Sequence, residues 1–221
     1  MKNPQNIADI AALNPDYLGF IFYEKSKRYV GQGHALALQL PTEVSPRFRD
    51  AEGQAKGIKK IGVFVNSTLE YILSKVEKYD LDLVQLHGEE SPEFCRDFRR
   101  ANGIAFAKSG VKKAQIIKVF SIGQTFDFQQ LEPYKSYCDY FLFDTKGKEK
   151  GGNGFAFNWD VLKDYDNEKP FFLSGGLSLE NIEKVKELTH LNILAIDMNS
   201  GFEIEAGLKD VEKIKQLMAI M

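Results

Sequence analysis

The stretch FFLSGGLSLENIEKVKEL, residues 171–188, decides the fold. Its first six residues, 171–176, begin with an uninterrupted apolar run, which predicts a strand buried on both faces. Two glycines then interrupt the pattern, as expected of a turn. From 179 to 188 apolar residues recur at helical spacing, and Ser178 stands where it can cap a helix. The stretch therefore predicts one strand–loop–helix unit.

The same unit recurs along the whole chain. Apolar runs predict seven strands, at residues 17–22, 60–65, 83–88, 116–121, 140–145, 171–176 and 194–199. Helical spacing follows Asn3-Pro4, where Ile7, Ile10 and Ala11 share a face, and it also appears at 68–78, 179–188 and 211–218. Strands that alternate with helices are typical of an α/β protein with a parallel sheet.

The strand count favours a closed barrel in a single domain, residues 1–221. The sequence opens directly on a helix at Asn3-Pro4, so we expect the strand before that helix to be missing from residues 1–221. With that strand the total is eight, the number of a (β/α)8 TIM barrel. The alternative is an open doubly wound sheet. The segment 42–60 is expected to be a long connection on the face of the barrel away from the site.

Composition points to a small ligand. The chain has 29 basic and 31 acidic residues, a formal charge of −2, and no basic stripe that would indicate nucleic acid or an anionic membrane as partner. It shows no run of 18 apolar residues and no signal peptide, which favours the cytoplasm. Cys95 and Cys138 lack the paired spacing of a metal site, and we expect both to be reduced and structural.

Polar side chains follow the predicted strands at the ends where barrels hold their active sites. Arg28, in the loop after the first visible strand, has the fork of donors that suits a carboxylate or phosphate. Gln85 and His87 alternate onto one face and are expected to point into the mouth of the barrel. A solvated basic loop and a structural histidine are the alternative interpretations.

Two glycine turns follow the last two strands. Gly175 and Gly176 open a helix, and Ser200 and Gly201 come after the final strand. Glycines let backbone N–H groups approach an anion closely, and phosphate sites of barrels recur at this position. The turns predict a phosphate site, although they could also be no more than tight loops.

Asp144 ends the buried run YFLFDT, and a glycine-rich loop containing Gly151, Gly152 and Gly154 follows it. A carboxylate at the end of a buried strand costs solvation energy unless it is paired or lies at a cleft. A flexible loop beside it could close as a lid and exclude water, which would raise the pKa of the carboxyl. We therefore predict a general acid or base at Asp144.

Taken together, the strand ends resemble the phosphoribosylanthranilate isomerase family of tryptophan biosynthesis. The likeness rests on the motifs GFIFYEKSKRYV, VQLHGEE, LFDT with GGNG, FFLSGG and AIDMNSGFE, in order along nearly the whole chain. It implies an Amadori rearrangement of a sugar phosphate without metal or organic cofactor. Asp144 would be the general acid and Arg28 would face the anthranilate carboxylate, with Gln85 and His87 in support and the glycine turns on the phosphate.

The resemblance also implies a catalytic cysteine that the supplied chain does not contain. In the family, a Lys-x-Cys-Gly motif on the first strand supplies the base, and neither Cys95 nor Cys138 stands where it could replace it. We expect weak or no activity from residues 1–221, and favour an internal start over a seven-stranded descendant. A non-catalytic sugar-phosphate-binding barrel, or another phosphate-binding barrel lyase or isomerase, are the alternatives. A monomer and a homodimer are both compatible with the sequence.

Overall fold

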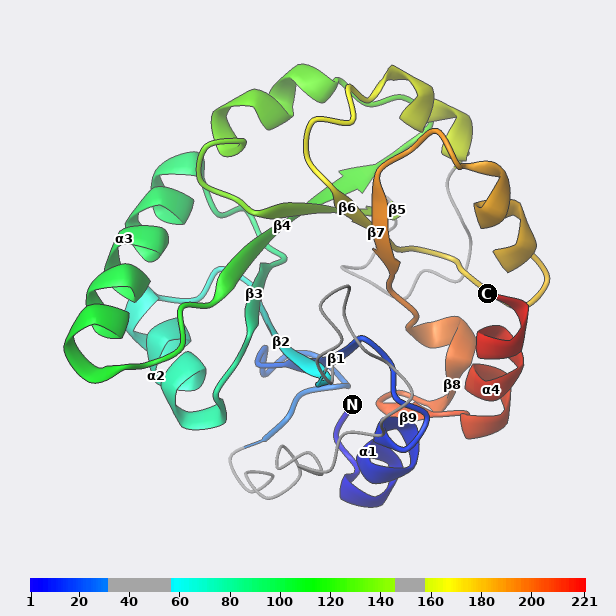
Figure 1. Cartoon of the computed structure of the whole chain (residues 1–221), viewed down its shortest axis with the longest axis horizontal. Helices are drawn as coiled ribbons and strands as arrows, with labels where there is room; N and C mark the ends of the chain where they lie inside the picture. Colours follow the sequence, from blue (N-terminus) through cyan, green and yellow to red (C-terminus); the bar gives the residue numbers. More distant parts are fainter. Residues whose placement is uncertain (32–56, 146–157) are drawn as a thin grey trace.

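The computed structural model describes residues 1–31, 57–145 and 158–221. Seven parallel strands form its main sheet, and each strand pairs with the next one along the chain. They are β1 (Tyr17–Ile21), β2 (Lys59–Phe64), β3 (Leu83–Leu86), β4 (Gln115–Ile122), β5 (Tyr140–Thr145), β6 (Phe171–Leu173) and β7 (Ile193–Ile196). The sheet curves through an arc with the helices on its outer side (Figure 1).

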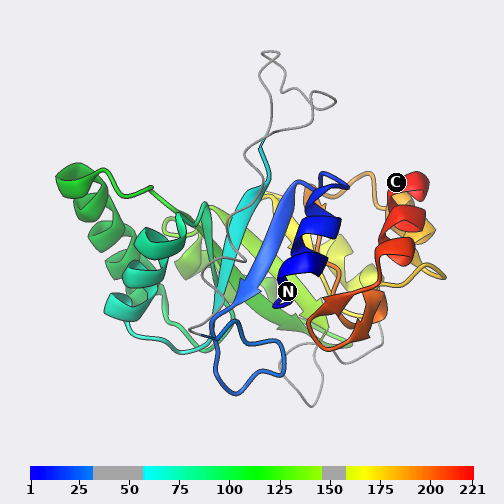
Figure 2. The ribbon, with the colours of Figure 1, turned by 90° about the horizontal axis from the view of Figure 1, so that it is seen from below.

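Each helix has an identifiable start. Asn3 caps α1 (Pro4–Ala11), Thr68 caps α2 (Leu69–Tyr79) and Ser91 caps α3 (Pro92–Ser109), each through its side-chain oxygen. Asp210 does the same for α4 (Val211–Ile220). Short 3-10 helices complete the outer layer: η2 (Phe128–Tyr134), η3 (Trp159–Asp164), η4 (Ile182–Glu187) and η5 (Ser200–Phe202). A hairpin of β8 (Glu203–Glu205) and β9 (Leu208–Lys209) precedes α4 (Figure 2).

Strand alternation divides the core in two. A small cluster fills the inside of the curved sheet: Ile61, Leu83, Ile117, Val119, Leu142 and Phe172. The alternate residues, such as Phe64 and Phe141, face outward and join the larger cluster under the helices. Polar residues at the carboxyl ends of the strands continue the inward-facing rows. The apolar floor thus lies directly beneath the polar ends.

All seven predicted strands are confirmed, and so is the barrel-like α/β class. A doubly wound sheet reverses its strand order partway, whereas this order runs without reversal from β1 to β7. Within the described ranges β1 pairs only with β2 among the named strands, and β7 pairs only with β6. The described part of the sheet is therefore a barrel that does not close between β1 and β7.

One predicted helix is wrong in type and start. Instead of an α-helix over 179–188 capped by Ser178, the chain forms the 3-10 helix η4. The Asn181 side chain accepts from the backbone of Ser178 at 3.0 Å and donates to Gly176 O at 2.8 Å. These local bonds hold the backbone in a turn, so the helix begins only at Ile182. Of the expected long connection at 42–60, residues 42–56 lie outside the described ranges.

Candidate active site

A cavity of about 800 Å³ runs along the inner side of the sheet, from the start of β1 to the polar carboxyl ends of the strands. Volumes of this size are common for small-molecule sites. Most of the predicted site residues lie in its lining, and so do other polar residues such as Ser174, Asp197 and Lys209. The predicted ones are Arg28, Gln85, His87, Asp144, Gly175, Gly176, Ser200 and Gly201. Residues from five loops or strand ends, far apart in sequence, thus meet around one space.

Asp144 is one of two buried carboxyls with a raised pKa in the wall of this cavity, and Asp197 is the other. It ends β5, faces the same side of the sheet as Leu142, and is only 5% exposed. Burial raises its pKa to about 6, and the neighbouring carboxylate of Asp197 adds to the rise. The Thr145 N–H, which donates to Oδ1 at 2.9 Å, and the Ser174 hydroxyl oppose this rise only in part. The carboxyl can therefore exchange a proton near neutral pH.

His87 lies next to this carboxyl. Its Nε2 is 3.7 Å from Oδ2 of Asp144. On the other side of the ring, the Gln85 amide nitrogen is 2.9 Å from Nδ1. An amide nitrogen donates, so this contact leaves Nε2 to face Asp144. Gln85 and His87 thus form the pair at the mouth that the alternation predicted.

The two glycine turns pack against each other, and the first of them packs against Asp144. Gly175 has φ +88°, and a Cβ there would lie 2.2 Å from Thr145 Oγ1 and 2.8 Å from Asp144 Oδ1. Gly176 also has a positive φ, of +64°. A Cβ on Gly201 would lie 2.4 Å from the carbonyl oxygen of Leu177, in the neighbouring turn. Only glycine allows the backbone to approach this closely.

Arg28 is held by a carboxylate that sequence analysis did not identify. Its Nε lies 3.0 and 2.9 Å from the two carboxylate oxygens of Glu203, and its Nη2 lies 2.6 Å from Oε2. The Lys209 ammonium is 3.3 Å from Glu203 Oε1. Hydrogen bonds from Arg28 and the charges of both cations keep the pKa of Glu203 below its usual range, although burial opposes this.

Other functional candidates were missed for different reasons. Asp197 and Ser174 share a hydrogen bond of 3.4 Å, and burial raises the pKa of Asp197. Asp197 stands at a strand end, so the reasoning applied to Asp144 could have found it. Glu203 ends the motif AIDMNSGFE, but nothing in that motif shows that it contacts Arg28, and Lys209 comes from the same short hairpin.

A buried ion pair supports the loop that carries His87. Lys118 Nζ lies 3.2 Å from Glu90 Oε2 and donates to Gly88 O at 2.8 Å. Glu90 in turn accepts from the backbone N–H groups of Asn66 and Gly88. These bonds link the carboxyl ends of β2 and β3 to the middle of β4 on the outer side of the sheet.

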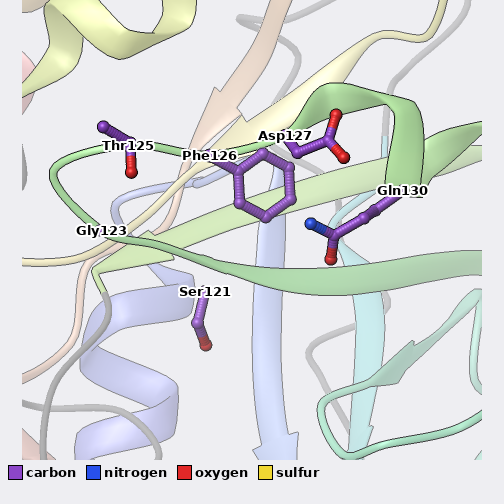
Figure 3. A pocket seen from close by; sticks show the side chains of 6 residues that line it. All are labelled: Ser121, Gly123, Thr125, Phe126, Asp127 and Gln130. Carbon is purple, nitrogen blue, oxygen red and sulfur yellow. The ribbon is translucent and has the colours of Figure 1, made fainter.

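A second, shallower hollow of about 510 Å³ lies beyond the end of β4 (Figure 3). Its lining contains one ionisable side chain, Asp127, whose oxygen caps η2. None of the predicted site residues takes part in it. The catalytic candidates therefore gather in the larger cavity alone.

Three further predictions concern the lid glycines, the cysteines and membrane-spanning helices. The expected lid glycines, Gly151, Gly152 and Gly154, lie outside the described ranges. Cys95 and Cys138 are both free and buried, as expected of structural thiols, and they are hydrogen-bonded to each other. No cysteine is among the residues that line the cavity in the described parts of the chain. Within those parts, too, no helix is both long and apolar enough to cross a membrane.

The fold and the site define a class: a TIM-barrel-like α/β protein with a buried carboxyl beside glycine turns at the carboxyl end of the sheet. Comparison with known proteins specifies it further. The family profile described as N-(5'phosphoribosyl)anthranilate (PRA) isomerase matches residues 1–219. The chain therefore belongs to this family, and it is an enzyme of the phosphoribosylanthranilate isomerase type in tryptophan biosynthesis.

Individual relatives agree with the profile. The N-(5'-phosphoribosyl)anthranilate isomerase of Parabacteroides distasonis is 41% identical over 218 residues, which cover 99% of this chain and 89% of that protein. The crystal structure of the Thermotoga maritima isomerase superposes with a TM-score of 0.76 at 29% identity, covering all of this chain and 94% of the other. A further structure, with a TM-score of 0.72, 27% identity and coverage of 99% and 93%, is a complex with reduced 1-(o-carboxyphenylamino)-1-deoxyribulose 5-phosphate.

Proposed function

We propose that the chain converts N-(5-phosphoribosyl)anthranilate into 1-(2-carboxyphenylamino)-1-deoxyribulose 5-phosphate by an Amadori rearrangement, with Asp144 as the general acid. One observation carries this assignment. Asp144 is a buried carboxyl in the cavity wall whose pKa is raised to about 6. A general acid works best when its pKa lies near the working pH.

The acid step follows from this protonation state. Protonated Asp144 donates its proton to the ring oxygen of the ribose as the C1–O bond breaks, and the anilino nitrogen shares its electron pair to form a Schiff base. A base then removes the proton on C2, and the resulting enolamine becomes the ketone. His87, 3.7 Å from Asp144, is placed to support the acid. No metal or organic cofactor enters this proposal.

The ligand's two anionic ends suit opposite features of the cavity. We assign the anthranilate carboxylate to Arg28, because a guanidinium matches a carboxylate in shape and charge. We assign the phosphate to the turns at Gly175–Gly176 and Ser200–Gly201, where closely packed glycine backbones offer N–H groups. Gln85 orients His87, and the 151–154 glycines are proposed to form a lid over the ligand.

The C2 base is proposed to come from a strand that pairs with β1 and β7. Both strands have an edge without a partner strand in the described ranges, and an open edge costs stability. In the described residues no cysteine lines the cavity, so we expect residues 1–221 alone to turn over slowly. The loss of one positioned acid–base group lowers a rate by about 10² to 10⁴.

The proposal also includes the partner, the oligomeric state and the cellular location. The partner is a small sugar phosphate, with neither nucleic acid nor membrane involved, and the enzyme acts as a monomer or homodimer. A cytoplasmic location is supported by the two free buried thiols, because reducing compartments keep cysteines unpaired.

The test combines a substitution with an extension. A version that carries an added N-terminal strand with the Lys-x-Cys-Gly motif should rearrange the fluorescent substrate faster than residues 1–221. In that version Asp144→Asn should lower kcat by about 10² to 10⁴, whereas Asp164→Asn, at an exposed aspartate of η3, should leave it unchanged.

Two results would contradict the proposal. Retained turnover in Asp144→Asn would exclude this residue as the acid. Tight binding of the reduced product analogue without any rearrangement, even in the extended version, would favour a non-catalytic sugar-phosphate-binding barrel.

A further inference from the structure

The Arg28–Glu203 contact has a defined geometry. Glu203 meets the guanidinium along one side, through Nε at 3.0 and 2.9 Å and Nη2 at 2.6 Å. The contact joins residues 175 positions apart, and it connects the loop after β1 to the β8–β9 hairpin. An ion pair with bonds to two guanidinium nitrogens fixes orientation as well as position.

In its contact with Glu203 the guanidinium uses Nε and Nη2 but not Nη1. A guanidinium has five N–H groups in a planar fork, and a carboxylate on the Nε–Nη2 side uses two of them. The end edge, formed by Nη1 and the second Nη2 hydrogen, can donate to another carboxylate in the same plane. Arg28 lines the cavity, whereas Glu203 is not among the described residues that line it, and its side chain is only 3% exposed.

Glu203 is itself rigidly anchored. Its Oε1 accepts from the Gly207 N–H at 3.2 Å and lies 3.3 Å from Lys209 Nζ. Lys209 in turn donates to the carbonyl oxygens of Met198 and Asn199, just after β7. The guanidinium is therefore connected through two side chains to the loop beside the glycine turn at Ser200.

We propose that Glu203 is the positioning residue that sets selectivity for a carboxylate on the ligand's aromatic ring: it fixes Arg28 so that the guanidinium presents its end edge to the cavity. This inference rests on the proposed function, which assigns the anthranilate carboxylate to Arg28. Glu203 does not touch the ligand in this account. It acts through the orientation of Arg28, so its substitution should alter selectivity more than general affinity.

The experiment compares two ligands by titration calorimetry. One is reduced 1-(o-carboxyphenylamino)-1-deoxyribulose 5-phosphate, and the other is the same compound without the ring carboxylate. Wild-type protein should prefer the first by about 10- to 100-fold, as expected for a charge-assisted bond. Glu203→Asp keeps the charge but shortens the side chain, and it should reduce this preference about 10-fold while the second ligand binds within about twofold of wild type.

Glu203→Gln removes the negative charge of this side chain. It keeps the length of the side chain but offers one carbonyl acceptor, so the preference should also fall. A preference unchanged in the Asp variant, or increased in the Gln variant, would show that Glu203 is only a counter-charge and would overturn the inference. Equal losses for both ligands would overturn it as well, because they indicate a purely structural role.

Controls distinguish this inference from the proposed function. Glu205→Asp, at an exposed residue of the same strand β8, should keep the wild-type preference. Thermal unfolding of each variant shows that it is folded. If wild-type protein binds neither ligand, the proposed function itself fails. If it binds both equally, the assignment of Arg28 to the carboxylate fails, and the role inferred for Glu203 fails with it.

Discussion

Asp144 and Glu203 are both carboxyls buried at the mouth of the same barrel, yet their pKa values move in opposite directions. Asp144 is 5% exposed and its pKa is raised to about 6. The Glu203 side chain is 3% exposed and its pKa is lowered. Burial alone favours the neutral form of both groups. The difference must therefore come from what each carboxyl contacts.

Their partners explain the difference. Asp144 receives hydrogen bonds from the neutral groups of Thr145 and Ser174 and is repelled by a second carboxylate, Asp197. Glu203 contacts two cations, Arg28 and Lys209. The barrel thus holds one carboxyl with a raised pKa, which can exchange a proton near neutral pH, and one with a lowered pKa, which stays charged there. A proton donor and a fixed counter-ion require these opposite environments.

Removal of Glu203 gives the larger expected change in stability. Glu203→Ala would leave Arg28 and Lys209 near each other without their shared counter-ion. Loss of one partner from a buried ion pair typically costs 3 to 5 kcal/mol, and since Arg28 is partly exposed we expect about 3 kcal/mol at pH 7 by urea unfolding. Glu205→Ala, on the exposed part of the hairpin, should change stability by less than about 0.5 kcal/mol.

The pH dependence of this loss has a definite sign. Because the pKa of Glu203 is lower in the folded protein, its contribution is complete above the carboxyl's ordinary pKa of 4.5 and disappears as the pH falls below it. The difference between wild type and Glu203→Ala should therefore shrink in acid. A difference independent of pH would exclude the charge as its cause.

Substitution of Asp144 should have a smaller effect in the opposite direction. Its pKa is higher in the folded protein than the ordinary 3.8, so ionisation destabilises the fold increasingly between pH 3.8 and about 6. Asp144→Asn removes that cost and should stabilise the protein at pH 8 by about 1 to 3 kcal/mol in urea unfolding. At pH 3 the gain should vanish. A variant less stable than wild type at pH 8 would contradict the assigned burial effect.

The sequence alone predicts the strands and Asp144, but it does not predict the role of Glu203 or the form of one helix, for physical reasons. Apolar runs define the seven strands because a parallel sheet is covered on both faces. The strand-end rule found Asp144 because it directly follows a buried run. Glu203 was not found because its contact with Arg28 depends on the fold, 175 positions along the chain. The predicted α-helix at 179–188 does not form over its full length, because the Asn181 side chain makes hydrogen bonds with the backbone of Ser178 and Gly176.

The most direct test of the central claim is the titration of Asp144 itself. Carboxyl 13C NMR of protein labelled at aspartate, with Asp144→Asn used to assign the signal, measures its protonation without substrate or turnover. The account predicts a midpoint near pH 6 for Asp144. A midpoint at or below pH 4, the ordinary value for an aspartate, would contradict the assignment of Asp144 as the buried acid of this enzyme.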